Sequence, residues 1–311
     1  MPPTVIVICG PTATGKTKLG VALAHAFQGE VVSADSMQLY RGMAVGTAQP
    51  TLEEREGIPH HMIAVADPGE NYSAARYARE ASACVEDILA RGKQPIIVGG
   101  TGLYIDALLT GRDYACAPTP ACRAQLQRRA ETQGLPALWA ELQGIDPQAA
   151  ARLHPNDAKR VLRALEVWYE TGETITQHDL RTRALPPRYA ALTLALTYQD
   201  RQALYRRIDA RVDQMLRQGL LEEVRGLLDQ GLESTAMQAI GYKELVPVLR
   251  GQCELEEAVE AVKRHSRQYA KRQLTWFRRK EGIWWLELGE NPDFSAAIQV
   301  STRYLQEKGL R

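Results

Sequence analysis

The sequence predicts an α/β fold in which a parallel sheet is flanked by helices and interrupted by an all-helical insertion. Residues 4–9 (TVIVIC) form a continuous β-branched run, which is typical of a strand buried on both faces of a parallel sheet. Strand-like and helix-like stretches then alternate up to about residue 111. From residue 112 to residue 188 the chain becomes helical and rich in arginine, and strand signal returns after it.

The first part of the chain predicts three further strands. A glycine-rich turn follows the first strand and leads into a helix over residues 16–27, whose apolar positions share one face. Strands are expected over residues 30–34, 60–66 and 95–98. Ser73 is placed to cap a helix before the last of these strands. The inward residues of that helix are Tyr77, Ala78, Ala81, Val85, Ile88 and Leu89.

The second part predicts the insertion and the return to the sheet. Helices are expected from about residue 121 to residue 172, between prolines at positions 118, 120, 186 and 187. A strand over residues 189–197, helices from about 201 to 280, a strand over 283–288 and a final helix follow. We therefore predict an α/β core with a C-terminal basic helix over residues 1–111 and 189–311, and a helical insertion over residues 112–188.

The composition is ordinary for a soluble globular protein. Of 311 residues, 45% are hydrophobic and 24% are charged, and the net charge is +1, so any nucleic-acid binding must come from local charge. No stretch approaches the roughly 20 apolar residues that cross a bilayer, and the N-terminus has no signal-peptide pattern. We expect a cytoplasmic monomer without membrane association. The scattered cysteines, which show no disulfide or zinc spacing, suit a reducing compartment: Cys9, Cys84, Cys116, Cys122 and Cys253.

Residues 10–17 (GPTATGKT) match the phosphate-binding pattern G-x-x-x-x-G-K-[ST] between a buried strand and a helix, so we expect a P-loop NTPase-like core. Gly10 and Gly15 let backbone N–H groups turn toward an anion, Lys16 adds a positive charge, and the Thr17 hydroxyl can ligate Mg²⁺. Which phosphate is bound stays open at this point. The strand over 95–98 runs into Gly-Gly-Thr rather than into the aspartate of a Walker B motif.

Two polar side chains follow predicted strands at the edge where open α/β sheets build their sites. Asp35 could act as a general base or a Mg²⁺ ligand, or it could cap a turn, because Asp-Ser often opens turns. Thr101 could donate to a leaving oxygen, or it could cap the helix that follows. We expect the glycines before it, Gly99 and Gly100, to allow close approach of the backbone to a ligand.

Residues 263–280 (KRHSRQYAKRQLTWFRRK) contain eight lysines and arginines and no acid, with aromatic residues between them. This segregation of charge predicts contact with nucleic acid, whereas Trp276 and Phe277 are expected in the core. A second basic stretch covers residues 154–170, with a helix start expected near Pro155.

A pair of arginines lies in the helical stretch after residue 200. Arg207 and Arg211 are at i and i+4 on one helix face and could neutralise a leaving diphosphate. The alternative is that they form surface salt bridges with Asp209 or Asp213.

Taken together, these segments resemble the tRNA dimethylallyltransferases, the IPP transferase family, of the bacterial type. DSMQLYRGM with GTAQP is specific to that family, and we expect a bacterial-type member without the zinc-finger extension of eukaryotic members. The resemblance rests on GPTATGKT (10–17), SADSMQLYRGMAVGTAQP (33–50), VGGTGLY (98–104), HPNDAKRVLRALEV (154–167), QAIGYKEL (238–245) and the basic helix through residue 280.

The resemblance implies a reaction and a set of site residues. The cradle would hold dimethylallyl diphosphate, with Mg²⁺ as cofactor, and the dimethylallyl group would move to N6 of the adenosine directly 3′ of the anticodon in the stem-loop of a tRNA. Asp35 would be the general base, with Thr101 and Lys16 as further catalytic residues. The diphosphate would be bound by Gly10, Thr12, Ala13, Thr14, Gly15, Lys16, Thr17 and Arg211. The tRNA would be contacted by Asp35, Ser36, Met37, Gln38, Thr101, Arg123, Lys159, Arg160, Val161, Leu162, Arg163, Gln238, Ala239, Ile240, Gly241, Tyr242 and Lys243.

Three other functions share part of this pattern. An adenylate isopentenyltransferase would carry the cradle and the aspartate, but it has no need of a basic insertion or a basic helix. A P-loop kinase or ATPase that acts with RNA would consume ATP. An RNA-binding module with a structural anion site would bind without forming a product.

Overall fold

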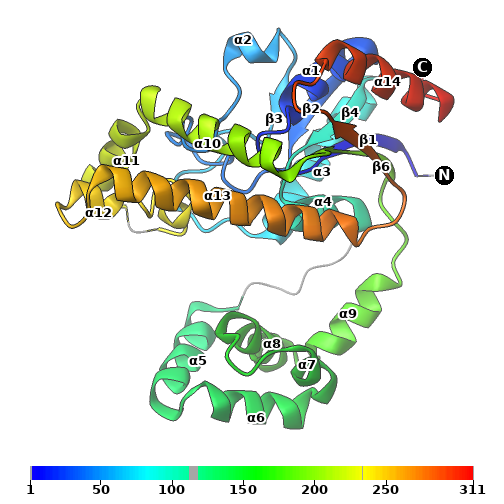
Figure 1. Ribbon diagram of the computed structural model, residues 1–311. Helices are drawn as coiled ribbons and strands as arrows, with labels where there is room; N and C mark the ends of the chain where they lie inside the picture. Colours follow the sequence, from blue (N-terminus) through cyan, green and yellow to red (C-terminus); the bar gives the residue numbers. More distant parts are fainter. Residues whose placement is uncertain (1, 112–117, 233, 311) are drawn as a thin grey trace. The chain divides into compact units, whose positions relative to one another are not determined.

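A six-stranded parallel sheet lies in the larger of two compact units of the computed structural model, which describes residues 2–111, 118–232 and 234–310 (Figure 1). The larger unit is Met1–Leu109 with Arg188–Arg311, and the smaller is Thr110–Pro187. The strand order is β3-β2-β4-β1-β5-β6, and each neighbouring pair is parallel. The predicted α/β class is therefore confirmed. The strands are β1 (Thr4–Cys9), β2 (Gly29–Ser33), β3 (His60–His61), β4 (Gln94–Val98), β5 (Ala190–Tyr198) and β6 (Ile283–Leu288).

The order of the strands decides where the functional loops meet. β1 lies between β4 and β5, and β2 lies beside β4. Because all these strands run in the same direction, the segments that leave β1, β4 and β2 emerge next to one another at the carboxyl edge. The glycine-rich turn after Cys9, the aspartate after β2 and the Gly-Gly-Thr segment after β4 are therefore neighbours in space, although about 90 residues separate the first from the last.

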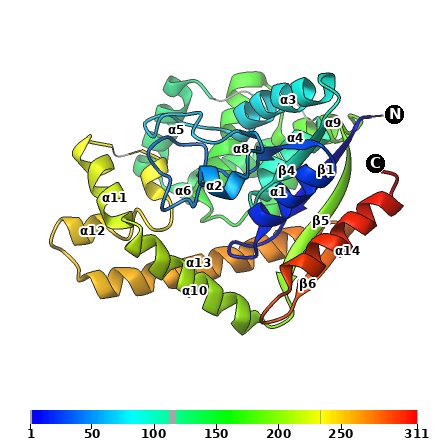
Figure 2. The ribbon, with the colours of Figure 1, turned by 90° about the horizontal axis from the view of Figure 1, so that it is seen from above.

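Helices cover both faces of this sheet. The helices of the larger unit are α1 (Lys16–Ala26), α2 (Leu52–Arg55), α3 (Ala74–Ala90), α4 (Gly102–Thr110), α10 (Arg201–Arg217), α11 (Leu220–Asp229), the 3₁₀ turn η1 (Ala236–Gln238), α12 (Val246–Leu249), α13 (Leu255–Arg278) and α14 (Phe294–Glu307). Figures 1 and 2 show α1 and α14 on one face, and α3 and α4 on the other. The alternation of side chains along β1 explains this arrangement, since Ile6 and Ile8 belong to one core cluster and Val5 and Val7 to the other.

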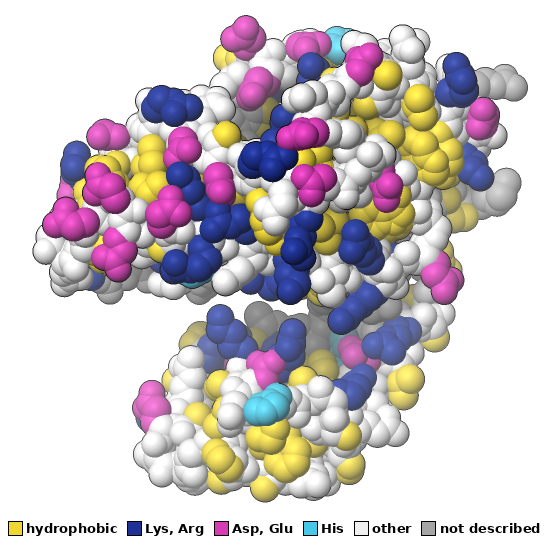
Figure 3. Space-filling view, viewed as in Figure 1, with side chains coloured by type: hydrophobic (Ala, Val, Ile, Leu, Met, Phe, Trp, Pro, Cys, Tyr) yellow, Lys and Arg dark blue, Asp and Glu magenta, His cyan; other side chains and the backbone are white. Residues whose placement is uncertain are grey.

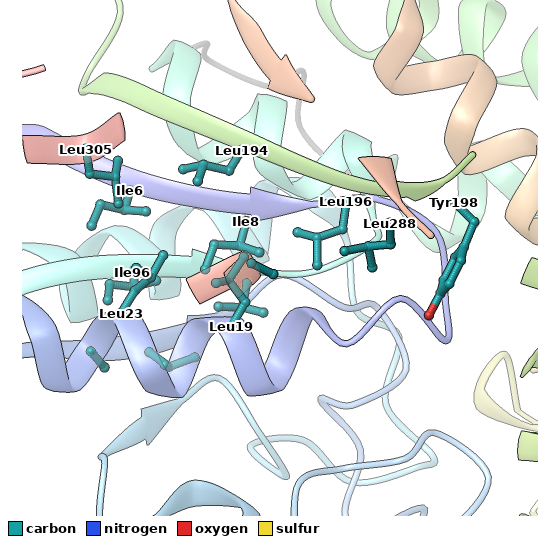
Figure 4. Packing of buried hydrophobic residues seen from close by; sticks show 14 of the residues in the cluster. Ile6, Ile8, Leu19, Leu23, Ile96, Leu194, Leu196, Tyr198, Leu288 and Leu305 are labelled. Atoms are coloured by element: carbon teal, nitrogen blue, oxygen red, sulfur yellow. The ribbon is translucent and has the colours of Figure 1, made fainter. Parts of the chain in front are cut away.

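The first of these clusters holds the phosphate-loop helix on the sheet. Leu19 and Leu23 of α1 are fully buried and pack with Ile8, Ile96 and Leu196 of the strands (Figure 4). Truncating a buried leucine of this kind to alanine costs about 2–5 kcal/mol. The position of the helix start at Lys16 is thus set by apolar packing one and two turns further along α1.

Two long helices, α10 and α13, pack against each other and extend beyond the sheet (Figure 1). At their far end a third core cluster joins them to α11, α12 and the segment after β2. Tyr40, Met43 and Tyr242 are buried there. This cluster fixes the loop that begins at Asp35 against the helices that follow β5.

The smaller unit is helical, with a core of its own around Leu138, Val161 and Leu165. Asp157, rather than Pro155 or Asn156, caps α8, because its side chain accepts a hydrogen bond from the backbone N–H of Arg160. The last helix, α9, lies beyond the helical stretch predicted up to residue 172. The helices are α5 (Pro120–Gln133), α6 (Leu135–Ile145), α7 (Pro147–Arg152), α8 (Ala158–Thr171) and α9 (Ile175–Arg183).

The strand expected over residues 60–66 is only two residues long. Met62 and Ala64 have φ values of 61° and 52°, which interrupt an extended strand, and Ala66 forms a single bridge with Tyr40 instead. The predicted boundary at residue 112 and Cys116 lie outside the described residues.

Within the described ranges no helix is long and apolar enough to cross a membrane. Cys9, Cys84, Cys122 and Cys253 are free thiols.

Candidate active site at the carboxyl edge of the sheet

The turn between β1 and α1 is shaped by two glycines. Gly10 has a φ of +129°, and a Cβ there would lie 2.4 Å from the carbonyl oxygen of Leu196. Gly15 has a φ of +83°, and a Cβ would lie 2.1 Å from the ring of Phe294. Gly15 also precedes α1 without a side-chain cap, so the first N–H groups of the helix are available to an anion.

Lys16 lies inside this turn. Its Nζ donates a hydrogen bond of 2.6 Å to the carbonyl oxygen of Pro11, which also accepts one of 2.9 Å from the Thr14 hydroxyl. Burial and the neighbouring positive charge of Arg211 lower the pKa of Lys16 to about 8, and the negative charge of Asp35 opposes this shift. Lys16 and Arg211 share this partly buried site, and no acid of the described residues lies at salt-bridge distance from either, which favours the binding of an anion.

Arg211 lies close to Lys16 and forms no salt bridge with any residue that the structure describes. Burial lowers its pKa. The alternative pairing with Asp209 or Asp213 is wrong, because Asp209 pairs with Arg267 at 2.6 Å and Asp213 pairs with Lys263 at 2.8 Å. Arg207, the other member of the predicted pair, lies over the ring of Tyr198.

Asp35 follows β2 and faces the same site. One carboxylate oxygen, Oδ1, accepts a hydrogen bond of 2.9 Å from the backbone N–H of Met37. This oxygen therefore caps the turn, as the alternative interpretation of Asp35 predicted. Oδ2 has no hydrogen bond among the described residues. The charge of Asp35 acts on Lys16, Arg211 and Tyr269. The carboxylate therefore has one oxygen held by the fold and one available for chemistry.

Thr101 joins the loop after β4 to the loop after β2. Its hydroxyl oxygen accepts a hydrogen bond of 3.0 Å from the backbone N–H of Ser36, and its own N–H donates to the carbonyl oxygen of Ala34 at 3.1 Å. The side chain therefore caps the Asp35 loop rather than α4. Tyr269 of α13 lies beside it, where burial and the charge of Asp35 raise the pKa of its hydroxyl to about 12.

The two glycines before Thr101, Gly99 and Gly100, lie against protein on the side where a Cβ would stand, and their approach to a ligand stays a prediction. A Cβ on Gly99 would lie 2.1 Å from the carbonyl oxygen of Ala34, and one on Gly100 would lie 2.1 Å from Nε2 of Gln273. The missing side chains allow β2 and α13 to pack directly on this segment. Gln273 had no sequence signal, since it is one uncharged residue within a basic helix.

The predicted tRNA contacts after Asp35 are also parts of the fold. Ser36, Met37 and Gln38 are partly exposed. The amide of Gln38 accepts a hydrogen bond from the Ser33 hydroxyl at 2.9 Å and donates one to the carbonyl oxygen of Ala48 at 3.0 Å. The Gln38 side chain therefore stabilises the conformation of the segment over residues 33–50, in addition to any role in binding.

The donor set fits Mg²⁺ only together with a ligand that supplies oxygens. The Thr17 hydroxyl is partly exposed at the start of α1, and Asp35 lies at the same edge. In the part of the chain that the structure describes, no three His, Cys, Asp or Glu side chains form a metal cluster. Mg²⁺ commonly keeps few protein ligands and takes the rest of its oxygens from phosphate and water.

The basic helix α13 is partly neutralised and partly open. Lys263, Arg267 and Lys280 pair with acids of other helices. Among the described residues, five exposed cations of α13 and its C-cap form no ion pair: Arg264, Lys271, Arg272, Arg278 and Arg279. Figure 3 shows lysine and arginine side chains gathered over α10 and α13. This surface has the charge that the backbone of a nucleic acid requires.

The aromatic residues of α13 divide between core and surface. Phe277 is buried as expected, but Trp276 is 39% exposed, so its assignment to the core is wrong. Trp276 packs over Gly102, where a Cβ would lie 2.2 Å from the indole, and Lys280 lies over its ring. Adjacent residues of an α-helix point about 100° apart, so Trp276 and Phe277 face different surroundings.

The segment over residues 238–243 has a mixed environment. Gln238 and Lys243 are exposed and Ile240 is partly exposed. Ala239, Gly241 and Tyr242 are buried, and the Tyr242 hydroxyl donates a hydrogen bond to Glu223. The buried side chains of this predicted tRNA contact therefore support the loop rather than face solvent.

In the helical unit, Arg123 pairs with the buried Glu166 at 3.0 Å, and Arg163 approaches the same carboxylate at 3.4 Å. Lys159 is exposed on α8, as is Arg160, which pairs with Asp157. Val161 is fully buried and Leu162 is partly buried against the same core. Lys159 and Arg160 are thus the predicted contacts of this helix whose side chains are exposed.

Comparison with known proteins adds to this geometry. Residues 38–280 match the model of the family described as IPP transferase. The chain is 46% identical to the tRNA dimethylallyltransferase of Geobacillus thermodenitrificans over 98% of this chain and 96% of that protein, and 49% identical to that of Thermomicrobium roseum over 98% and 92%.

Solved structures give the same result. A full-length tRNA isopentenylpyrophosphate transferase from Bacillus halodurans is 41% identical, with a TM-score of 0.74 over 99% of this chain and 97% of that one. A eukaryotic dimethylallyltransferase acting on tRNA is 32% identical, with a TM-score of 0.84 over 99% of this chain and 81% of that one.

Proposed function

The chain belongs to the IPP transferase family, and on that basis we propose that it transfers a dimethylallyl group from dimethylallyl diphosphate to N6 of the adenosine 3′-adjacent to the tRNA anticodon, releasing diphosphate. The observation that carries the proposal is the meeting of Lys16, Arg211, Asp35 and Thr101 at one edge of the sheet. Two cations suit a diphosphate, and a carboxylate beside them suits deprotonation of an amine.

The cradle would bind and activate the leaving group. As the allylic carbon–oxygen bond breaks, negative charge builds up on the diphosphate and positive charge on the carbon. The N–H groups at the start of α1, together with Lys16 and Arg211, would stabilise the developing negative charge. Thr17 would help to hold Mg²⁺, which would supply Lewis-acid stabilisation of that charge.

Asp35 would accept the proton that the adenine amine loses. The amine is a poor nucleophile because its lone pair is delocalised into the ring, so removal of a proton as the new carbon–nitrogen bond forms lowers the barrier. Thr101 holds the loop after Asp35 through Ser36. The available oxygen Oδ2 is the atom that would take the proton, since Oδ1 is bonded to Met37.

RNA would be bound by the exposed cations of α13 in the larger unit and, in the smaller unit, by Lys159 and Arg160. A base in a loop leaves its stack at a lower cost than a base in a duplex, which suits an adenosine next to an anticodon. A tRNA substrate and free thiols are consistent with a cytoplasmic location.

The test is mass spectrometry of nucleosides from unmodified tRNA after incubation with the protein, Mg²⁺ and dimethylallyl diphosphate. The informative variant is Asp35→Asn, because its amide oxygen can still accept from Met37 but the side chain no longer acts as a base. We expect the wild type to add one prenyl group to adenosine and the variant to be about 10²–10⁴-fold slower. Asp229→Ala, an exposed position far along α11, is the matched control.

Each alternative has its own outcome in this assay. Prenylation of free AMP but not of tRNA would assign the chain to the adenylate isopentenyltransferases. ATP consumption without prenyl transfer would favour a kinase or ATPase. Binding of tRNA without any product would leave an RNA-binding module. A wild-type rate for Asp35→Asn would disprove the role of Asp35 as a base.

A further inference from the structure

Gln273 is a buried polar side chain that the proposed mechanism does not use. It lies on α13 and is only 5% exposed. Both ends of its amide are bonded: Oε1 accepts from the backbone N–H of Thr12 at 3.0 Å, and Nε2 donates to the carbonyl oxygen of Gly100 at 3.0 Å. One side chain therefore connects α13 to the phosphate loop after β1 and to the catalytic loop after β4.

The bond to Thr12 acts on the peptide unit that holds Lys16. The N–H of Thr12 and the carbonyl oxygen of Pro11 belong to the same planar peptide. That oxygen accepts from Nζ of Lys16 at 2.6 Å and from the Thr14 hydroxyl at 2.9 Å. Because the peptide is rigid, the direction of its N–H determines the direction of its oxygen, and Gln273 thereby sets where the lysine ammonium is held.

The bond to Gly100 acts on the loop that carries Thr101. The amide approaches so closely that a Cβ on Gly100 would lie 2.1 Å from Nε2. The next residue, Thr101, receives the N–H of Ser36 in the Asp35 loop. Gln273 is thus bonded to one loop that holds a diphosphate-binding lysine and to another that supports the general base.

We propose that Gln273 is a positioning residue for prenyl transfer, which aligns the phosphate loop through Thr12 and the Thr101 loop through Gly100. The inference rests on the proposed function for its kinetic consequence, but the effect on diphosphate binding is independent of it. An apolar residue of the same length leaves the buried Gly100 carbonyl and the partly buried Thr12 N–H without their partner, so the phosphate loop relaxes to satisfy them. The Lys16 ammonium is then no longer held in place by the Pro11 carbonyl oxygen.

The first test uses Gln273→Met, which keeps the length of the side chain and removes both hydrogen bonds. We expect the KM for dimethylallyl diphosphate and the Kd for inorganic diphosphate, measured by calorimetry, to rise about tenfold, the effect of one lost buried hydrogen bond. The KM for tRNA should change less than twofold. The control is Gln230→Met at an exposed C-cap position, where, among the described residues, the glutamine amide bonds to the carbonyl oxygen of Gly226 alone, and this variant should match the wild type.

The second variant, Gln273→Glu, separates alignment from packing. A protonated carboxyl has one acceptor and one donor like the amide, whereas the carboxylate cannot donate to Gly100. The Kd for inorganic diphosphate should therefore approach the wild-type value as the pH is lowered, whereas that of Gln273→Met stays raised by a constant factor. This variant keeps the inference testable if Gln273→Met does not fold.

An unchanged Kd for inorganic diphosphate in both variants would overturn the inference, as would an equal rise in the KM for tRNA. A wild-type protein that binds diphosphate but transfers no prenyl group would instead overturn the proposed function. In that case the calorimetric comparison still decides the role of Gln273.

Discussion

Glu223 of α11 offers the sharpest prediction about how the site is supported. Its carboxylate accepts hydrogen bonds from the backbone N–H groups of Val45 and Gly46 at 2.8 and 2.9 Å, and from the Tyr242 hydroxyl. A Cβ on Gly46 would lie 2.5 Å from the Tyr242 ring, so the loop is pressed against this network. Glu223 therefore holds the segment over residues 33–50 against the helices that follow β5.

The magnitude follows from the three bonds. A hydrogen bond to a charged acceptor contributes about 1.5–3 kcal/mol, so three set an upper limit of about 4.5–9 kcal/mol. Glu223 is only partly buried, and water replaces some of these bonds when the carboxylate is removed. We expect Glu223→Ala to lower the free energy of unfolding by about 3 kcal/mol. Glu223→Gln should lose about 1–2 kcal/mol, because an amide nitrogen cannot accept the bond that one carboxylate oxygen accepts.

The assay combines urea unfolding with amide hydrogen exchange read by mass spectrometry. In Glu223→Ala the amides of Val45 and Gly46 should lose protection, and the urea midpoint should fall. The control is the neighbouring Glu222→Ala, whose side chain is exposed and makes no hydrogen bond among the described residues, and which should stay within about 0.5 kcal/mol of the wild type. Equal effects of the two substitutions, or unchanged protection of Val45 and Gly46, would refute the reasoning.

Three further predictions concern charge. The pKa of Lys16 is lowered to about 8, and we propose that its charged form binds diphosphate, so the KM for dimethylallyl diphosphate should rise as the pH rises from 7 to 9; a flat profile would contradict this. Arg91, with Lys93 and His61, holds the pKa of the buried Glu30 well below its usual range, so its contribution to stability is present above about pH 4.5 and is lost as the pH falls below that value. Glu30→Gln should therefore cost about 2–3 kcal/mol in urea unfolding at pH 7 and less at pH 3, with the difference shrinking further as the pH is lowered, and a constant difference would count against the ion pairs. Arg272→Glu on α13 should weaken tRNA binding and reduce its salt dependence in a filter-binding assay, whereas Arg303→Glu on α14 should have little effect, and equal losses would exclude α13 as the contact surface.

Much of the fold could be predicted because it depends on local pattern. The buried run over residues 4–9, the glycine turn and the amphipathic helix from residue 16 are signals within one short stretch, and each is found where expected. The Ser73 cap is confirmed by the hydrogen bond from the backbone N–H of Arg76. The strand over residues 60–66 could not be predicted correctly, because left-handed backbone at Met62 and Ala64 leaves no clear signal in residues that are common in strands.

The candidate site was accessible to sequence reasoning only in part. Lys16 and Asp35 stand in recognisable motifs. Arg211 faces the phosphate loop because Asp209 forms its ion pair with Arg267 of α13 instead, and the sequence of α10 does not show this long-range pairing. The exposure of Trp276 was also not predictable from the sequence, since its neighbour Phe277 is buried and both are large aromatic residues.

By itself the sequence determined the parallel α/β core, the phosphate-binding turn and the family, because these depend on residue types at short spacing. Only the tertiary structure decided what the long-range partners do: the amide of Gln273 bonded to Thr12 and Gly100, and the carboxylate of Glu223 bonded to the loop at Val45. The physical reason is that these hydrogen bonds join segments up to 261 residues apart in the sequence. Each bond depends on the burial and the orientation of both partners in the folded chain, and the local sequence of either segment does not determine these.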